Sequence, residues 1–133
     1  MKEITNKKDV SKFLGISENE ILDFYVYLKG NWQYKDTKGY YHLYRKVNKN
    51  WIELTKGIKA IYVNSYGNKY WKYRDENKYD HLFKFLKRGW VELTKNINTT
   101  CALPYDNGYW EYLTKDKYWY FFDENNKLIK KYK

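Results

Sequence analysis

The sequence predicts a mainly β protein made of three tandem 39-residue β repeats behind a short N-terminal helical cap. Aromatic residues make up 22% of the chain, and such residues are typical of strands. Tryptophan recurs at a fixed spacing of 39 residues, at Trp32, Trp71 and Trp110. Residues 32–58 and 71–97 are identical at 12 of 27 aligned positions. Self-similarity at one fixed period indicates repeated structural units.

Residues 1–23 are predicted to form the helical cap. Residues 7–15 (KKDVSKFLG) and 17–25 (SENEILDFY) are interpreted as two short helices joined at Gly15. Glycine suits the left-handed conformation that commonly ends a helix. The SENE motif at 17–20 is a capping box, in which serine and glutamate side chains bond the free N–H groups of a helix start.

The stretch DVSKFLGISENEI resembles the helix-turn-helix of bacterial regulators over about 16 residues, with Gly15 in the turn. The resemblance implies a second helix that reads DNA. That helix would carry Glu18, Glu20 and Asp23, which a phosphate backbone repels. We therefore expect a helical cap packed on the β domain, whose acidic residues would suit a basic protein surface.

Each repeat is predicted to hold four short strands. In the first repeat, residues 31–35 alternate between polar and aromatic side chains, as in a half-buried strand. A turn at 36–39 leads to an aromatic run at 40–47, and a tight turn leads to the strand WIELT. A fourth run, IKAIYV, leads into the next copy. The β domain is expected over 24–133, with repeats at about 24–62, 63–101 and 102–133.

Four strands repeated three times favour a closed, β-trefoil-like structure. The third copy lacks a fourth strand, and residues 24–28 (FYVYL) supply an extra one ahead of the first copy. The two ends would then pair and remove an exposed edge. Two alternatives remain: an open sheet of repeated hairpins, and propeller-type blades, of which three are too few for a ring without dimerisation.

The segment KYWYFFDENNKLIKK (117–131) resembles single units of bacterial β-hairpin repeats of the MORN-like and WG types. It has an aromatic pair, Asp-Glu-Asn at the turn and then Lys-Leu-Ile. The resemblance implies a hairpin at this point of the third copy.

Composition and charge limit which kinds of partner and which cellular location can be expected for the protein. The net charge of +10 attracts polyanions, although residues with AT-rich codons dominate the chain and account for part of the lysine excess. An AT-rich genome is typical of phages and mobile elements of low-GC bacteria. The start has no apolar signal region, and no stretch is long and apolar enough for a membrane span. We expect a cytoplasmic monomer or dimer with no cofactor.

Several features favour a protein that is not an enzyme. The single Cys101 excludes an internal disulfide and a multi-cysteine zinc site, and no phosphate-binding or nucleophile motif is present. His42 and His81 occupy the same place in two copies, so a threefold structure would separate them. Glu53 and Glu92 are also equivalent, and we expect them to pair with local lysines. No catalytic residue and no metal ligand are assigned.

The recurring tryptophans are expected in the core, because only packing demands one bulky residue in every copy. Tyrosines at less regular positions are expected at the surface beside basic residues. Aromatic rings interleaved with lysine and arginine hold single-stranded nucleic acid, because bases stack on the rings and cations follow the phosphates. The predicted nucleic-acid or partner surface comprises Tyr41, Tyr70, Lys72, Arg74, Lys84, Lys87, Arg88, Tyr109 and Trp119.

Two other functions remain open. The first is a phage- or mobile-element-encoded inhibitor that binds a host defence protein complex, as anti-CRISPR proteins do, with Glu18, Glu20 and Asp23 of the cap as its contact residues. The second is a carbohydrate-binding module, in which the same aromatics stack on sugar rings. The leading hypothesis is a small binding protein for RNA or single strands.

Overall fold

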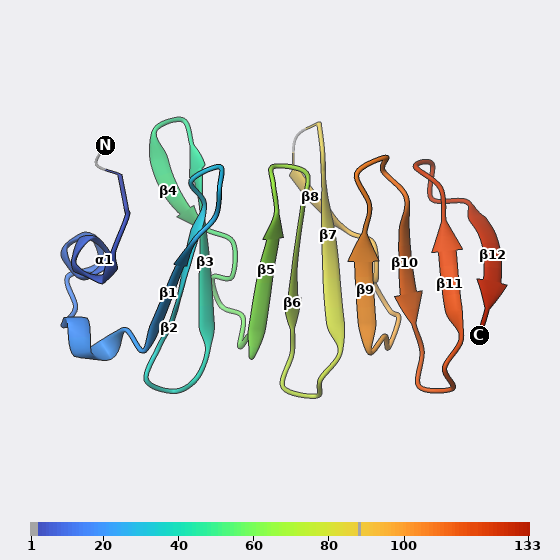
Figure 1. The fold of residues 1–133 in the computed structure, drawn as a ribbon, viewed down its shortest axis with the longest axis horizontal. Helices are drawn as coiled ribbons and strands as arrows, with labels where there is room; N and C mark the ends of the chain where they lie inside the picture. The colour runs from blue at the N-terminus through green and yellow to red at the C-terminus, as the bar shows by residue number, and fades with distance from the viewer. Residues whose placement is uncertain (1–2, 88) are drawn as a thin grey trace.

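In the computed structural model, three four-stranded antiparallel sheets follow one another in a row behind one short helix (Figure 1). The structure describes residues 3–87 and 89–133. The two ends of the chain lie at opposite ends of the row (Figure 1). Within the described ranges, no helix combines the length and the apolar character that crossing a membrane requires.

Each sheet is a simple meander of four strands in chain order. The first sheet contains β1 (Asp23–Val26), β2 (Trp32–Lys35), β3 (Tyr41–Val47) and β4 (Asn50–Glu53). The second contains β5 (Tyr62–Tyr66), β6 (Tyr70–Arg74), β7 (Asp80–Leu86) and β8 (Gly89–Glu92). The third contains β9 (Cys101–Pro104), β10 (Trp110–Leu113), β11 (Trp119–Phe122) and β12 (Leu128–Tyr132).

The N-terminal cap contains one helix rather than two. Helix α1 (Lys7–Leu14) begins at the cap residue Asn6 and ends at Gly15, whose φ of 70° is left-handed as expected. The capping box at Ser17 is present, but it starts only a 3₁₀ turn, η1 (Glu18–Glu20). The prediction of a second helix over 17–25 is wrong, because the chain then pairs with β2 as strand β1. The structure thus has no second helix where the helix-turn-helix resemblance implies one.

Aspartate side chains shape the turns that join the second and third strands of the first two sheets. Asp36 accepts hydrogen bonds from the backbone N–H groups of Lys38 and Tyr40, at 2.8 and 3.0 Å. Asp75 makes the same pair of bonds in the second copy. Such side-chain bonds to the backbone two and four residues on are what favour aspartate at turns.

The recurring tryptophans lie in the core, as predicted. Trp32, Trp71 and Trp110 are at most 3% exposed. Each stacks on an aromatic ring directly opposite in the next strand, as Trp32 does on Tyr44 with ring centroids 4.3 Å apart. Stacked pairs of this kind add to the energy of area burial.

Neighbouring sheets share buried cores, and each of the two cores contains one fully buried leucine from the preceding sheet. Leu43 of the first sheet packs against Trp71 in the core of the second, and Leu82 of the second sheet packs against Trp110 of the third. Both leucines are fully buried. At the other end, α1 covers the tryptophan face of the first sheet, with Val10 fully buried against it. Every tryptophan face is therefore covered by the unit that precedes it in the chain.

The three sheets are not closed into a ring, so the trefoil-like closure that the sequence favours is not confirmed. The FYVYL segment pairs with β2 of its own sheet, and β12 pairs with β11. The sequence places the runs IKAIYV and NTTCAL at the ends of the first and second copies. In the structure these runs instead lead into β5 and β9, the first strands of the next sheets. Three complete four-stranded sheets result, and β12 remains a free edge at the C-terminal end (Figure 1).

Because the row is open at its C-terminal end, alanine substitutions at equivalent positions of two copies should lower the free energy of unfolding by different amounts. Leu82→Ala should lower the free energy of unfolding by about 2–5 kcal/mol, because it empties the joint between two sheets. Phe121→Ala, one repeat later, should cost clearly less, because Phe121 is only half-buried at the end of the row. Urea denaturation measures both. Equal costs would indicate that a further layer covers Phe121.

Candidate functional site

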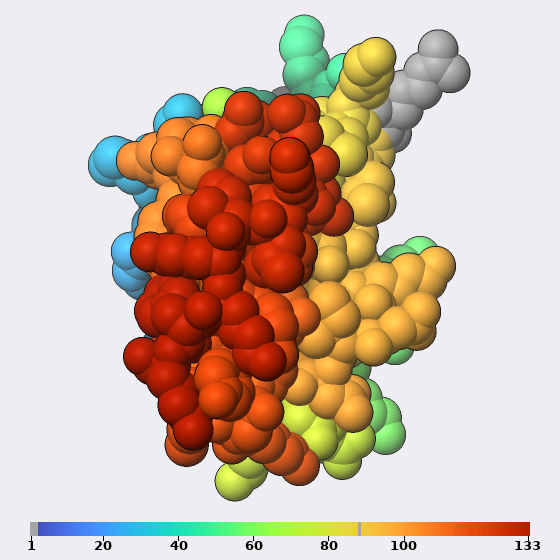
Figure 2. Space-filling model, turned by 90° about the vertical axis from the view of Figure 1, so that its right-hand side faces the viewer, coloured from blue at the N-terminus to red at the C-terminus, as the bar shows by residue number. Residues whose placement is uncertain are grey.

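The C-terminal end of the row exposes a sheet face that the other two copies bury. Leu43 and Leu82, which join the sheets, correspond at a spacing of 39 residues to Phe121. Phe121 lies directly opposite Glu111 on one side and Lys130 on the other, so all three side chains share this face. Figure 2 looks onto this end of the molecule, where the C-terminal strands face the viewer. We call this surface the C-terminal face.

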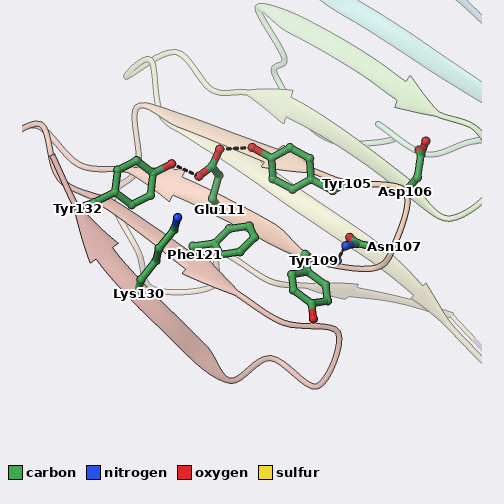
Figure 3. Close-up of a pocket in the computed structure, with 8 residues that line it drawn as sticks. All are labelled: Tyr105, Asp106, Asn107, Tyr109, Glu111, Phe121, Lys130 and Tyr132. Carbon is green, nitrogen blue, oxygen red and sulfur yellow. Dashed lines mark hydrogen bonds between the residues drawn. The ribbon is translucent and has the colours of Figure 1, made fainter.

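A hollow of about 540 Å³ lies on the C-terminal face. Four of its eight lining residues are aromatic, and Figure 3 shows Glu111 between the rings of Tyr105 and Tyr132. The Phe121 ring is central, with its centroid 6.0 Å from that of Tyr105 and 5.6 Å from that of Tyr109. The lining residues are Tyr105, Asp106, Asn107, Tyr109, Glu111, Phe121, Lys130 and Tyr132.

Glu111 is the buried polar group of this hollow, with only 6% of the residue exposed. The Tyr132 hydroxyl donates to its Oε1 at 2.5 Å, and the Tyr105 hydroxyl donates to its Oε2. Burial and then the bond to Glu111 raise the pKa of Tyr105, while the bond to Glu111 is the main cause of the raised pKa of Tyr132. Both hydroxyls therefore stay protonated as donors, and they fix the carboxylate in place.

Lysine ammonium groups lie over aromatic rings on both sides of β12. Lys130 is 5.0 Å from the ring centroid of Tyr132 and 5.6 Å from that of Phe121. Lys131, which points to the opposite side of the strand, is 4.4 Å from the ring centroid of Tyr118. Lys133 is 4.8 Å from the same ring. Cations and aromatic rings are thus interleaved along the free edge of the third sheet.

The structure places two of the predicted surface aromatics at this end and two elsewhere. Tyr109 lines the hollow, and Trp119 is half-buried at the start of β11. Tyr41 is half-buried at the joint between the first two sheets. Tyr70 is only 4% exposed and belongs to the core between the second and third sheets.

The predicted basic residues are also divided. Lys87 is exposed in the turn after β7, and Lys84 is half-buried, with its ammonium 3.5 Å from the backbone carbonyl of Glu124. Arg88 lies outside the described residues. Neither Lys84 nor Lys87 lines the hollow, so these two residues do not join the aromatic group there.

Lys72 is not part of an exposed surface, which corrects its assignment as a phosphate contact. It is 4% exposed, and its ammonium donates to Asp80 at 3.1 Å and to the Ala102 carbonyl at 3.0 Å. Asp80 is fully buried and also accepts from Arg74 at 2.8 Å. Buried charges must be paired to be tolerated. Lys72 therefore serves the joint between the second and third sheets, whereas Arg74, whose side chain is 34% exposed, pairs with Asp80 within its own sheet.

The two histidines each bond a pair of carboxylates within their own sheet. His42 lies 2.8 Å from both Asp36 and Glu53, and each ring nitrogen has one of them as its partner. His81 repeats the arrangement with Asp75 and Glu92. The glutamates therefore pair with histidines, not with the lysines that the sequence suggested. With both nitrogens bonded, neither ring has a nitrogen free for proton transfer to a substrate.

The acidic residues of the cap remain at the surface. Glu18, Glu20 and Asp23 are exposed. Glu20 accepts from the backbone N–H of Ser17 at 3.0 Å, which completes the capping box. In the part of the chain that the structure covers, no group of three or more histidine, cysteine or acidic residues is arranged to hold a metal ion.

Of the residues that line the hollow, the sequence predicts only Tyr109 as a surface contact. A signal was present in the repeat alignment. Where the first two copies have Ile52 and Val91, the third has Lys130, and the buried leucines give way to Phe121. Both changes lie on the C-terminal face, where Phe121 and Lys130 line the hollow.

No protein-family model, curated protein or solved structure matches the chain. The fold and the C-terminal face are therefore the basis for assigning a function.

The paired histidines predict a loss of stability in mild alkali. Burial acts to lower the pKa of His42 and His81, but the hydrogen bonds and charges of their carboxylates together raise it above the usual value. Each imidazolium thus stabilises the fold fully below the unfolded pKa of about 6.5, and the contribution is lost as pH rises through the raised value. Melting temperature should fall as the pH rises from about 6.5 through the raised pKa of the two histidines.

The control for the pH experiment is the double variant His42→Asn with His81→Asn, in which this fall should largely disappear. A wild-type melting temperature that stays constant over the same range would contradict the assignment of charged histidines.

Lys72→Met should affect folding rather than binding. It leaves the buried Asp80 with one cation fewer, which should cost about 3–5 kcal/mol of unfolding free energy. Lys69→Met removes the same charge from an exposed position nearby and should cost less than about 0.5 kcal/mol. Urea denaturation measures both variants. A small cost for Lys72→Met would show that its ammonium reaches solvent.

Proposed function

We propose that the protein is a non-enzymatic binding protein for single-stranded nucleic acid and that it binds through the C-terminal face and the β12 edge. The observation that carries this proposal is the interleaving of Lys130, Lys131 and Lys133 with aromatic rings at 4.4–5.6 Å. Stacking rings combined with mobile cations are the means by which proteins hold single strands.

The position of these groups supports single strands over duplex. The rings of Tyr109, Phe121 and Tyr132 line an open hollow, so an unstacked base would have access to them. A duplex keeps its bases stacked inside and would offer only its phosphates. The β12 edge has all five residues exposed, which leaves its lysines accessible to a polyanion.

The net charge supports the binding of a polyanion but does not indicate where on the protein it binds. Much of the basic surplus is spread over turns and α1, where Lys7, Lys8 and Lys12 are exposed. These lysines add to a long-range attraction for polyanions. Only lysines that contact phosphates contribute strongly to the salt dependence of binding.

The test is fluorescence anisotropy of labelled single-stranded RNA, single-stranded DNA and duplex DNA at several salt concentrations. Replacing Lys130, Lys131 and Lys133 by alanine should weaken binding and reduce the slope of log K against log salt by about 2, because each phosphate contact contributes about 0.7. Lys7, Lys8 and Lys12 replaced by alanine give a control with the same change in charge.

The proposal fails if both triple variants lose affinity equally, since binding would then depend on the net charge of the protein and not on the three C-terminal lysines. It also fails if binding by the wild type vanishes by about 0.15 M salt, where exposed charges are largely screened.

A protein partner is the second candidate, as expected for an inhibitor of a host defence complex. It is favoured by Leu128 and Ile129, both 48% exposed on β12, which is an edge strand of the third sheet. Such an edge can accept a strand from another protein. This candidate takes precedence if no oligonucleotide binds at physiological salt.

A further inference from the structure

We propose that the hollow around Glu111 is a base pocket that selects guanine from a single strand. This inference rests on the proposed function and names the ligand group that the site takes. Phosphates and rings alone would bind every base alike. A fixed carboxylate among the rings adds a preference for bases that present N–H donors.

The walls of the hollow provide the stacking surface. Phe121 occupies the centre, and the rings of Tyr105, Tyr109 and Tyr132 surround it (Figure 3). A volume of about 540 Å³ falls within the range of small-molecule sites. The hollow can therefore admit one nucleotide.

The carboxylate of Glu111 supplies the selectivity. Each of its two oxygens accepts one phenol hydrogen, from Tyr105 or Tyr132. A carboxylate accepts about four hydrogen bonds, so about two acceptor positions remain. The Watson–Crick edge of guanine has two adjacent donors, N1–H and N2–H₂, which match a carboxylate. Uracil instead has one N–H between two carbonyl oxygens, which the carboxylate repels.

The two tyrosines make this acceptor rigid. A free glutamate would have to lose side-chain freedom to bind a base. Glu111 has already lost it, because the residue is 94% buried and both oxygens are held. A buried carboxylate facing a base without donors would be left poorly paired, and this makes the discrimination strong.

Lys130 is placed to contact the backbone of the bound strand. Its ammonium lies over the rings of Phe121 and Tyr132, and Asp106 lies at the opposite end of the hollow (Figure 3). A strand whose base stacks on Phe121 can thus place its phosphate beside Lys130 and away from Asp106. The pocket and the basic edge of β12 then bind one continuous strand.

The other copies cannot offer the same pocket. The residues at the place of Glu111 are Gln33 and Lys72. Lys72 is buried and bonded to Asp80, and Gln33 accepts from the Tyr27 hydroxyl beside the fully buried Leu43. Within residues 3–87 and 89–133, a carboxylate at this position with an open face above it occurs in the third copy alone.

The experiment compares four five-nucleotide RNAs, UUUUU, UUGUU, UUAUU and UUCUU, in the anisotropy assay. One variable base in a uridine context avoids structures that guanine runs form. The wild type should bind UUGUU about tenfold more tightly than UUUUU, as one bidentate base contact discriminates in general. Glu111→Gln should reduce this ratio to about twofold or less, since its amide offers one acceptor and adds donors.

Glu124→Gln is the matched control, because it removes the same charge from an exposed residue that does not line the hollow. It should leave the ratio unchanged. If Glu111→Gln does not fold, Tyr132→Phe serves in its place, because it removes one hydroxyl that holds Glu111 without altering the ring. It should lower the ratio and leave the salt slope unchanged.

The outcomes separate the two proposals. Equal and tight binding of all four RNAs, or a guanine preference that survives both Glu111→Gln and Tyr132→Phe, would overturn the base pocket and leave the proposed function standing. Binding of none of them at physiological salt, while longer single strands also fail to bind, would overturn the proposed function and the base pocket together.

Discussion

The packing of one leucine against the next tryptophan sheet is the interaction on which this architecture depends. Leu43 and Leu82 are fully buried in these joints, and each covers a face that its own sheet could not shield. A single four-stranded meander would leave its tryptophan face exposed to water, which is unfavourable. The row therefore holds together by nearest-neighbour contacts, as repeat proteins do. Helix α1 performs the same covering role at the first sheet, where Val10 and its neighbours replace a preceding copy.

A row built in this way has two different ends, and the difference concentrates the free surface at one of them. The N-terminal end is covered by α1, whereas within residues 3–87 and 89–133 no further sheet packs on the outer face of the third one. The third copy differs from the others at this face: Phe121 stands where the first two copies have a buried leucine, and Glu111 stands where the second copy has a buried lysine. The hollow is made from side chains that would otherwise form a joint. The candidate function thus follows from the position of the copy in the row.

The charges of the protein divide into two groups with different roles. Lys72 and Arg74 are held by Asp80, and the two histidines are held by carboxylates of their own sheets, so these cations stabilise joints and turns. The lysines of β12 lie over aromatic rings at an exposed edge instead. Lysines on an edge strand also discourage uncontrolled pairing with other strands. The same residues can therefore protect the edge and bind a polyanion.

The repeat, its period and most of its strands can be predicted from the sequence, because a bulky residue such as Trp32 recurs wherever the same core is rebuilt. The end of α1 is predictable too, since Gly15 ends a helix by local backbone geometry. The open row, the burial of Lys72 and the position of Glu111 beside a hollow depend instead on how the sheets pack on one another. The alternation of a strand sequence predicts which side chains share a face of the sheet, but the burial of that face depends on what packs against it. Equivalent positions such as Leu82 and Phe121 therefore have different environments, because the third sheet packs against Leu82 whereas Phe121 lines an open hollow.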